Sequence, residues 1–296
     1  MRERLVASAT IAAISVMIAV ATWTGGAAAP ATDRRADMPA GQAANTNVDV
    51  ELVLAVDVSY SMDPDEQALQ REGYVAALTS PEFLNALRSG MHGRIAVTYF
   101  EWAGVADQRV VLPWRLVDGP ATAKAVADEI VAAPYRRAYR TSISGALLFA
   151  APLFDSSGYR GIRRVIDVSG DGSNNQGPPV AIVRDEVLTK DVTINGLPIM
   201  LKRAMPGSID LDDLDVYYED CVIGGPGAFV VPIKERAQFK DATRTKLVLE
   251  IAGLMPKPRA TSVPDVVPAA AEAPRISCTI GERMWQQRWG GGRDYN

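Results

Sequence analysis

The chain of 296 residues is long enough for one large domain or two small ones. Hydrophobic residues make up 48% of it and charged residues 22%, which is the profile of a globular protein with a sizeable core. Its formal net charge of −4 is small, and no basic stripe marks a surface for a polyanion. Composition therefore argues against a nucleic-acid-binding protein.

The start of the chain has the pattern of a secretory signal peptide. A short positive region with two arginines precedes an uncharged apolar run, Leu5–Trp23, and small residues follow at 25–29. We expect cleavage after Ala28 or Ala31, which leaves no integral membrane span in the mature chain. An uncleaved membrane anchor is the alternative, because the apolar run is about long enough to cross a bilayer. Either way the domain is exported, so we expect a periplasmic or secreted protein.

Composition divides the chain into four parts. Residues 1–28 form the expected signal peptide, and residues 29–47, which lack apolar periodicity, an expected flexible leader. Residues 48–253 carry patterned sequence of the size of one α/β domain, with no internal repeat. Residues 254–296 begin with a proline-rich stretch, for which we expect an extended linker followed by a C-terminal tail.

Strands and helices alternate within residues 48–253. The apolar run Leu52–Val56 is typical of a parallel strand buried on both faces, and Asp63, Pro64 and Glu66 fit the start of a helix with a capping box. The pattern predicts further strands at Arg94–Trp102, Val110–Trp114, Arg164–Ser169, Val192–Met200 and Ala228–Pro232, and further helices at Thr122–Ala132, Ser142–Phe154, Val180–Thr189 and Glu235–Ala252. This alternation indicates an α/β fold with a doubly wound, mostly parallel six-stranded sheet flanked by helices. Ligands of such sheets bind at the carboxyl ends of the strands.

Oxygen-bearing side chains gather at those positions. The first predicted strand continues into Asp57, Ser59 and Ser61, whose alternating spacing turns their oxygens toward one point. Thr141 precedes a predicted helix, and Asp171 follows the strand Arg164–Ser169 in a turn with two glycines. Two carboxylates and three hydroxyls form an all-oxygen set of the kind that hard cations such as Mg²⁺ prefer.

These segments resemble the metal-ion-dependent adhesion site of von Willebrand factor type A domains. The match consists of Asp-x-Ser-x-Ser at 57–61, of Thr-Ser-Ile-Ser-Gly-Ala-Leu from Thr141, and of Ser-Gly-Asp-Gly around Asp171, in that order. It covers roughly Val48–Gly253. The stretches 192–199 and 221–229 resemble a bacterial subfamily of exported proteins of unknown function within that superfamily.

The resemblance implies a role for each of the five residues. Ser59 and Ser61 would bind a metal directly, Thr141 directly in one state and through water in another, and Asp57 and Asp171 mostly through water. An Asp or Glu carboxylate of a protein partner would take the sixth position. The implied cofactor is a divalent ion, Mg²⁺ first and Mn²⁺ or Ca²⁺ as alternatives, in a protein that binds rather than catalyses.

The chain has two cysteines, Cys221 and Cys278. In an exported chain a disulfide is favoured over two free thiols, which remain the alternative. The bridge would close a loop of about 60 residues, which the chain-entropy model values at on the order of 4 kcal/mol.

Two other function classes stay open. A metal-dependent hydrolase could use the same site, although the chain lacks a G-x-S-x-G motif, a phosphate-binding P-loop and a Cys/His zinc cluster. A metal-free scaffold domain is the second alternative. The single histidine, His92, lies in a glycine-flanked turn where we expect it to be exposed.

Four further residues have structural interpretations as well as functional ones. We expect Asn174 and Asn175 to be loop residues, with contact to the partner as the other possibility. Trp285 and Trp289 in the tail are expected to pack back on the domain, held by Cys278, with a partner or membrane surface as the alternative.

Overall fold

A computed structural model describes residues 46–202, 210–253, 267–268 and 275–289. The expected signal peptide, nearly all of the expected leader and most of the proline-rich linker lie outside these residues. Within the described ranges, no helix has both the length and the apolar character that a membrane crossing requires.

The core of the domain is a sheet with the strand order β3-β2-β1-β4-β5-β6-β7. Its main strands are β1 (Thr46–Asp57), β2 (Ile95–Trp102), β3 (Gln108–Val117), β4 (Tyr159–Gly170) and β5 (Val192–Pro198), and the short strands β6 (Phe229–Val230) and β7 (Val267–Pro268) extend it. All neighbouring strands run parallel except the pairs β2–β3 and β6–β7. From β1 the order proceeds outward in both directions, so the predicted doubly wound sheet is confirmed. It has one strand more than the six expected, because β7 comes from the tail.

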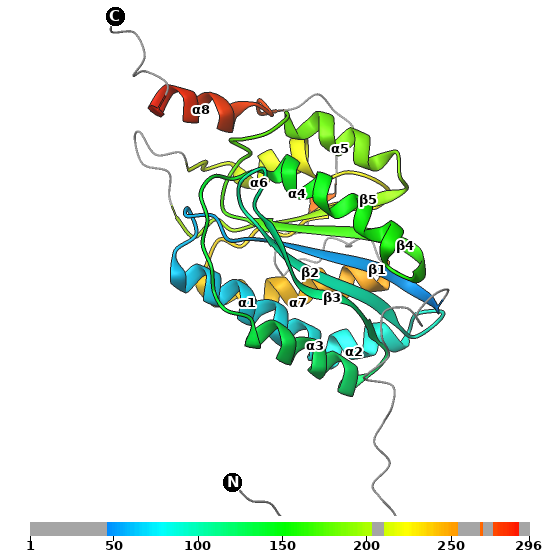
Figure 1. Ribbon diagram of the computed structural model, residues 1–296. Helices are drawn as coiled ribbons and strands as arrows, with labels where there is room; N and C mark the ends of the chain where they lie inside the picture. Colours follow the sequence, from blue (N-terminus) through cyan, green and yellow to red (C-terminus); the bar gives the residue numbers. More distant parts are fainter. Residues whose placement is uncertain (1–45, 203–209, 254–266, 269–274, 290–296) are drawn as a thin grey trace, which may run out of the picture. The chain divides into compact units, whose positions relative to one another are not determined.

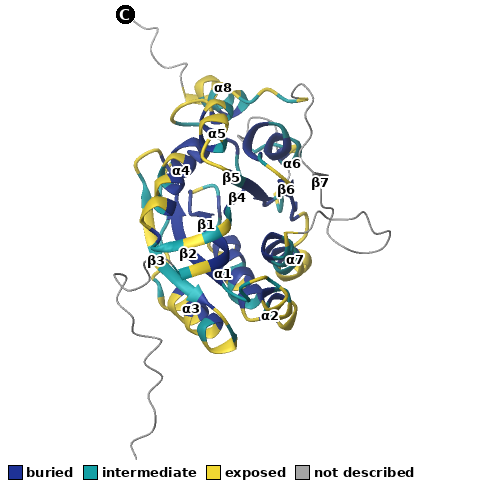
Figure 2. Ribbon diagram, turned by 90° about the vertical axis from the view of Figure 1, so that its right-hand side faces the viewer, coloured by how far each residue is buried: buried dark blue, intermediate teal, exposed yellow. Residues whose placement is uncertain are grey.

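Helices cover both faces of this sheet (Figure 1). One face carries α1 (Pro64–Leu78), α2 (Pro81–Arg88), α3 (Pro120–Ala132) and α7 (Phe239–Ala252), the last preceded by a 3₁₀ turn at Arg236–Gln238. The other face carries α4 (Ile143–Ala150), α5 (Val180–Leu188) and α6 (Leu214–Tyr217), which continues as a π-helical turn at Tyr218–Val222. A tail helix, α8 (Ile280–Trp289), follows. In Figure 2 the inner surfaces of the layers are buried and the outward sides of the helices exposed.

The helix α1 starts directly after the predicted metal-binding loop, and its start is fixed by local chemistry. The Asp63 carboxylate accepts a hydrogen bond from the Glu66 N–H, and the Glu66 carboxylate accepts one from the Asp63 N–H, both at 2.8 Å. Pro64 occupies the first turn. The capping box expected from the sequence is therefore confirmed, and it anchors one end of the loop 57–63.

One predicted helix is shorter than expected. The segment Ser142–Phe154 forms α4 only as far as Ala150 and continues as a 3₁₀ turn, Ala151–Ser156. Pro152 explains the change, because proline removes a backbone donor and its ring clashes with the preceding turn of an α-helix.

A charged cluster lies in the core between β4 and α7. Lys246, Asp167 and Glu250 are almost completely buried, and the Lys246 ammonium contacts both carboxylates, at 2.5 Å in the case of Asp167. Tyr74 donates to Asp167 at 3.0 Å. In this position Asp167 is a structural residue of the core.

Candidate metal centre

The five predicted ligands meet at the carboxyl end of the sheet. Asp57 is the last residue of β1, and Asp171 directly follows β4, the parallel neighbour of β1. Thr141 lies two residues before α4. The strand order departs in opposite directions from β1 and β4, so this is the point where a doubly wound sheet leaves room for a ligand.

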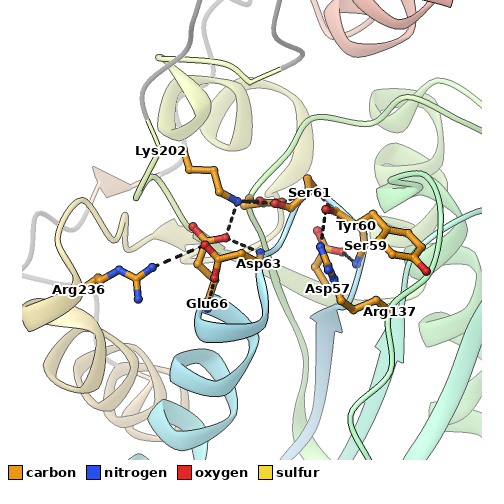
Figure 3. A network of polar contacts seen from close by, with 10 residues as sticks. Asp57, Ser59, Tyr60, Ser61, Asp63, Glu66, Arg137, Lys202 and Arg236 are labelled. Atoms are coloured by element: carbon orange, nitrogen blue, oxygen red, sulfur yellow. Dashed lines mark hydrogen bonds and ion pairs between the residues drawn. The ribbon is translucent and has the colours of Figure 1, made fainter.

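Four of the five residues form one chain of short polar contacts. The Ser59 N–H donates to Asp57 Oδ1 at 2.7 Å, and the hydroxyl oxygens of Ser59 and Ser61 lie 2.7 Å apart. The Ser61 hydroxyl donates to Asp171 Oδ1 at 2.6 Å. Figure 3 shows the Asp57–Ser61 part of this arrangement. The loop therefore holds its oxygens around one small volume.

Thr141 faces the same volume from the opposite loop. A methyl group placed on Gly172 would lie 3.6 Å from Thr141 Oγ1 and 4.0 Å from Ser61 Oγ. Asn175 ties this loop to the Asp171 turn, because its side chain accepts from the Thr141 N–H at 3.0 Å and its own N–H donates to the Thr141 carbonyl at 2.8 Å.

The donor set fits a cation. Asp57 Oδ2 is buried and has no hydrogen-bond partner among the described residues, although a buried carboxylate oxygen normally needs one. Glycine is required next to it, since a methyl group on Gly170 would come within 2.7 Å of Asp57 Oδ2 and 3.1 Å of the Tyr218 hydroxyl. The site thus combines an unpaired carboxylate oxygen with hydroxyl oxygens, the ligands of Mg²⁺ and similar hard ions.

Both carboxyl groups are harder to ionise than usual. Burial raises the pKa of Asp57 well above its ordinary range, and the nearby charge of Asp171 raises it further, while the hydrogen bonds from Ser59 lower it. Burial also raises the pKa of Asp171 to about 6, against the opposing effects of the Ser61 hydroxyl and the Lys202 ammonium. A cation in this volume would favour the ionised form of both groups.

Lys202 is the main feature of the site that the sequence did not predict. Its ammonium contacts the Ser61 carbonyl oxygen and Glu66 Oε2, the latter at 2.5 Å (Figure 3). It also lies 3.3 Å from Asp171 Oδ2. Burial lowers the pKa of Lys202, but the contacts with Glu66 and Asp171 outweigh that effect and raise it, so the group stays charged. The sequence feature that could have pointed to Lys202 is its position just beyond the carboxyl end of β5, the strand beside β4.

The loop asparagines have a positioning role that the sequence did not indicate. Asn174 is completely buried, and its side-chain oxygen accepts from the Ser144 N–H at 3.0 Å while its amide donates to Glu282 at 2.7 Å. It therefore connects the start of α4 with α8. His92 is partly buried and not exposed as expected. It lies at the other end of the sheet, where its backbone N–H donates at 2.9 Å to the carboxylate of Asp49, in the first half of β1.

The predicted disulfide is confirmed. Cys221 and Cys278 are bonded, with an S–S distance of 2.07 Å. The adjacent tail packs on the domain, as expected for Trp285, whose ring lies 3.2 Å from the Arg140 guanidinium carbon. For Trp289 the same expectation is wrong, because this residue is 62% exposed. The bridge and these contacts bring α8 against the loops that carry Thr141 and Asp171.

Strand order and the place of the site at the carboxyl end of the sheet are those of a von Willebrand factor type A-like fold, the fold that the motif predicted. Residues 47–255 match the model of a family described as a protein of unknown function, DUF1194, and the chain belongs to this family. Comparison with curated proteins finds no match.

Several solved structures are similar to this chain. Proximal thread matrix protein 1 from the mussel byssus, with a zinc-occupied metal-ion-dependent adhesion motif, is 14% identical over 70% of this chain and 49% of its own, with a TM-score of 0.48. A von Willebrand factor type A protein from Catenulispora acidiphila is 16% identical over 69% of this chain and 43% of its own, with a TM-score of 0.44. The pilus adhesin SpaC from Lactobacillus rhamnosus GG is 13% identical over 69% of this chain and 31% of its own, with a TM-score of 0.49. The chain spans half or less of the length of these proteins.

Proposed function

We propose that this domain binds a divalent cation, Mg²⁺ before Mn²⁺ or Ca²⁺, and through it a carboxylate of a protein partner outside the cytoplasm. The residues that would hold the ion come from three separate loops and are Asp57, Ser59, Ser61, Thr141 and Asp171.

The observation that carries the proposal is the buried, unpaired Asp57 Oδ2. It belongs to a carboxylate whose other oxygen accepts from the Ser59 N–H, at the start of the run of hydroxyls Ser59 and Ser61. A buried carboxylate oxygen without a partner costs free energy of at least about 1–3 kcal/mol. The described residues make no hydrogen bond to this atom, although the Asp171 N–H and the Tyr218 hydroxyl lie nearby. A cation in the same volume would offset that cost, which is the physical reason to expect one.

The type of ligand suggests what the site does. A bound ion would supply a positive centre open to an anionic oxygen from outside. Three of the five residues offer neutral hydroxyls, and the two carboxylates would hold the ion mostly through water, so part of the ion's positive charge would face outward. The chain's own groups orient these oxygens: Ser61 is held by Asp171, and Thr141 is held by Asn175. The carboxylate of a partner Asp or Glu side chain provides such an anionic oxygen.

A binding role is favoured over catalysis by the chemistry of the surrounding groups. The only histidine of the chain is at the opposite end of β1, so it is unavailable as a general base. The Tyr218 hydroxyl lies near the site, but burial and the charge of Asp57 raise its pKa far above neutral pH. We therefore propose a protein that binds without turnover.

Export is part of the same proposal. The apolar N-terminal run has the pattern of a signal peptide, and the bonded pair Cys221–Cys278 is typical of proteins from oxidising compartments. A periplasmic or secreted location accounts for both features.

A metal-free scaffold is a second candidate function, and one contact favours it. The Lys202 ammonium contacts Asp171 and Glu66, so part of the negative charge near the site already has a cationic partner. The two candidates differ in their response to added metal.

A thermal titration tests the proposed function. We expect Mg²⁺ to raise the melting temperature of the whole chain, because a ligand that binds only the folded state stabilises it by about 2.7 kcal/mol at one hundred times its dissociation constant. Asp57→Asn keeps the shape of the side chain and should remove this increment. The matched control is Asp185→Asn on α5, where the side chain is 66% exposed. An equal response of Asp57→Asn and wild type would reject the site, and no response of wild type to Mg²⁺, Mn²⁺ or Ca²⁺ would favour the scaffold.

A further inference from the structure

Two exposed tyrosines stack at the edge of the candidate metal centre. Tyr60 lies between Ser59 and Ser61, and Tyr139 lies two residues before Thr141. Their side chains are 47% and 76% exposed, and their ring centroids are 4.4 Å apart. Neither ring belongs to the buried core, so their packing does not account for their position.

The backbone brings the two rings together. The Tyr60 N–H donates to the Ala138 carbonyl at 2.9 Å, and the Ala138 N–H donates to the Val58 carbonyl at 3.0 Å. These bonds form a parallel bridge between Ser59 and Ala138. The loop with Tyr139 is therefore paired with the loop that carries three of the proposed ligands, and the tyrosine pair is held beside the metal centre in a fixed relation to it.

An arginine completes this surface. Arg137 donates from Nη2 to the Tyr60 carbonyl at 2.8 Å, and its guanidinium lies 4.8 Å from the centre of the Tyr60 ring (Figure 3). Two other arginines of the same loop are engaged elsewhere: Arg136 pairs with Glu101 and Asp107, and Arg140 stacks on Trp285. Across the described ranges, Arg137 has no carboxylate partner.

We propose that Tyr60, Arg137 and Tyr139, here called the aromatic rim, bind a second acidic side chain of the partner, next to the carboxylate that reaches the metal. This inference rests on the proposed function. The occupant is a protein segment with two acidic side chains and an apolar residue beside them. The partner's second acid meets Arg137, and its apolar residue covers the tyrosine rings.

Charge and surface chemistry both support this occupant. A guanidinium already oriented by one hydrogen bond retains other donors, and a carboxylate is the group that matches them best. Tyrosine and arginine are enriched where protein interfaces are tightest, because rigid rings supply contact area and exclude water around a polar pair. An incoming segment that covers the rings would also dry the space between Arg137 and its acid, which strengthens their interaction.

A random dodecapeptide phage library tests the proposal on the whole, disulfide-bonded chain. The library is bound in Mg²⁺ and eluted with chelator, so that only metal-dependent binders are sequenced. We expect wild type to select peptides with two acidic residues and an apolar residue. Arg137→Gln should select peptides with one acidic residue, and Tyr139→Ser should lose the apolar preference. A synthetic peptide selected by wild type should bind Arg137→Gln about tenfold more weakly in fluorescence anisotropy.

Matched controls come from the opposite end of the sheet. Arg88→Gln removes an exposed arginine at the end of α2, and Met91→Ser removes a side chain that is 83% exposed in the loop that follows. Both should select the same peptides as wild type.

The possible failures are distinguishable. If wild type enriches no chelator-eluted peptide, the proposed function fails and this inference fails with it. Two results would reject the aromatic rim and leave the metal function standing. Wild type could select peptides with only one acidic residue, or Arg137→Gln could still select peptides with two. In either case the aromatic rim does not bind a second acidic side chain. Two-acid peptides that bind wild type equally well in chelator would also overturn the proposal.

Discussion

Lys202 places a fixed positive charge beside the oxygens that we assign to the metal. Its ammonium lies 3.3 Å from Asp171 Oδ2 and 2.5 Å from Glu66 Oε2, and its side chain is 35% exposed. In the metal-free domain this charge stabilises two carboxylates that are almost completely buried. In a metal-bound domain it would repel the ion. Lys202 therefore stabilises the metal-free domain and weakens metal binding.

Lys202→Met separates these effects. We expect the melting temperature of the metal-free domain to fall, because Asp171 and Glu66 lose their cation. Mg²⁺ affinity should rise by about tenfold or more, because the repulsion between two nearby cations is removed and Glu66 adds an unpaired negative charge. Calorimetric titration measures the second quantity. Lys240→Met is the control, since its ammonium makes an exposed pair with Glu72. A lower Mg²⁺ affinity in Lys202→Met would show that the lysine organises the ligands more than it repels the ion.

The buried cluster around Glu250 predicts a pH effect on stability. Burial raises the pKa of Glu250 to about 7 from an ordinary value of 4.5, and the charge of Asp167 adds to this, while Lys246 and Asn195 lower it. One ammonium faces two carboxyl groups, so one of them resists ionisation. Because the folded-state pKa is the higher one, the stabilising contribution is complete below about pH 4.5 and is lost as the pH rises through 7.

The variant Glu250→Gln tests the predicted loss of stability with rising pH. The free energy of unfolding of wild type should fall between about pH 5 and pH 8, and the fall should be smaller in Glu250→Gln because the amide does not ionise. Asp171 contributes in the same direction in both proteins, so only the difference between them is diagnostic. Denaturant titrations across this range provide the measurement. A parallel pH dependence in the two proteins would place the titrating group elsewhere.

At the scale of elements, α8 is attached to the site loops by three kinds of contact. The disulfide fixes its start to the segment after α6, Glu282 bonds Asn174, and Trp285 stacks on Arg140. A further link is Arg275, which pairs with Asp220 at 2.9 Å and also contacts Glu219. The covalent bond makes the weaker contacts effectively intramolecular, so they persist although each is modest.

Cys278→Ser should release this attachment. The bonded residues are 57 positions apart, and a closed loop of that size is worth up to about 4 kcal/mol in the chain-entropy model. We expect a lower denaturation midpoint and a change in tryptophan fluorescence as Trp285 leaves Arg140. Reduced wild type should match the variant, and Ser277→Ala should match oxidised wild type. Equal midpoints for Cys278→Ser and oxidised wild type would show that the bridge adds no stability.

The elements differ in how far the sequence revealed them. The main strands and the five clustered residues were predictable, because a buried parallel strand is a continuous apolar run and its carboxyl end is where polar ligands appear. The helices α2, α6 and α8 were missed: α6 has only four residues, and α8 follows a proline-rich stretch that suggested no fold. Lys202 was missed for a different reason, since its role depends on β5 lying beside β4, which no local pattern encodes.

At the scale of the whole molecule, the two ends of the sheet carry different surfaces. The carboxyl end has the candidate metal centre, the aromatic rim and the attached tail helix. The amino end has the α2–β2 loop, in which His92 contacts Asp49. If recognition is metal-dependent, variants at the carboxyl end should weaken partner binding, and variants at the amino end should leave partner binding unchanged.

Capture of partners from an envelope extract tests this difference between the two ends of the sheet. The complex should dissociate in chelator, because chelator removes the ion to which the partner carboxylate is proposed to bind. Ser59→Ala and Thr141→Ala each remove one hydroxyl ligand and should weaken capture, while His92→Ala should retain it fully. Reaction rates with ester, phosphoester and peptide substrates should stay at background, since the carboxylates of the site are assigned to the ion and the single histidine lies at the opposite end of β1. If Asp57→Ala in Mg²⁺ and wild type in chelator both capture as much partner as wild type in Mg²⁺, the metal does not mediate recognition. The Lys202 contacts would then explain the site as a scaffold with its own internal cation.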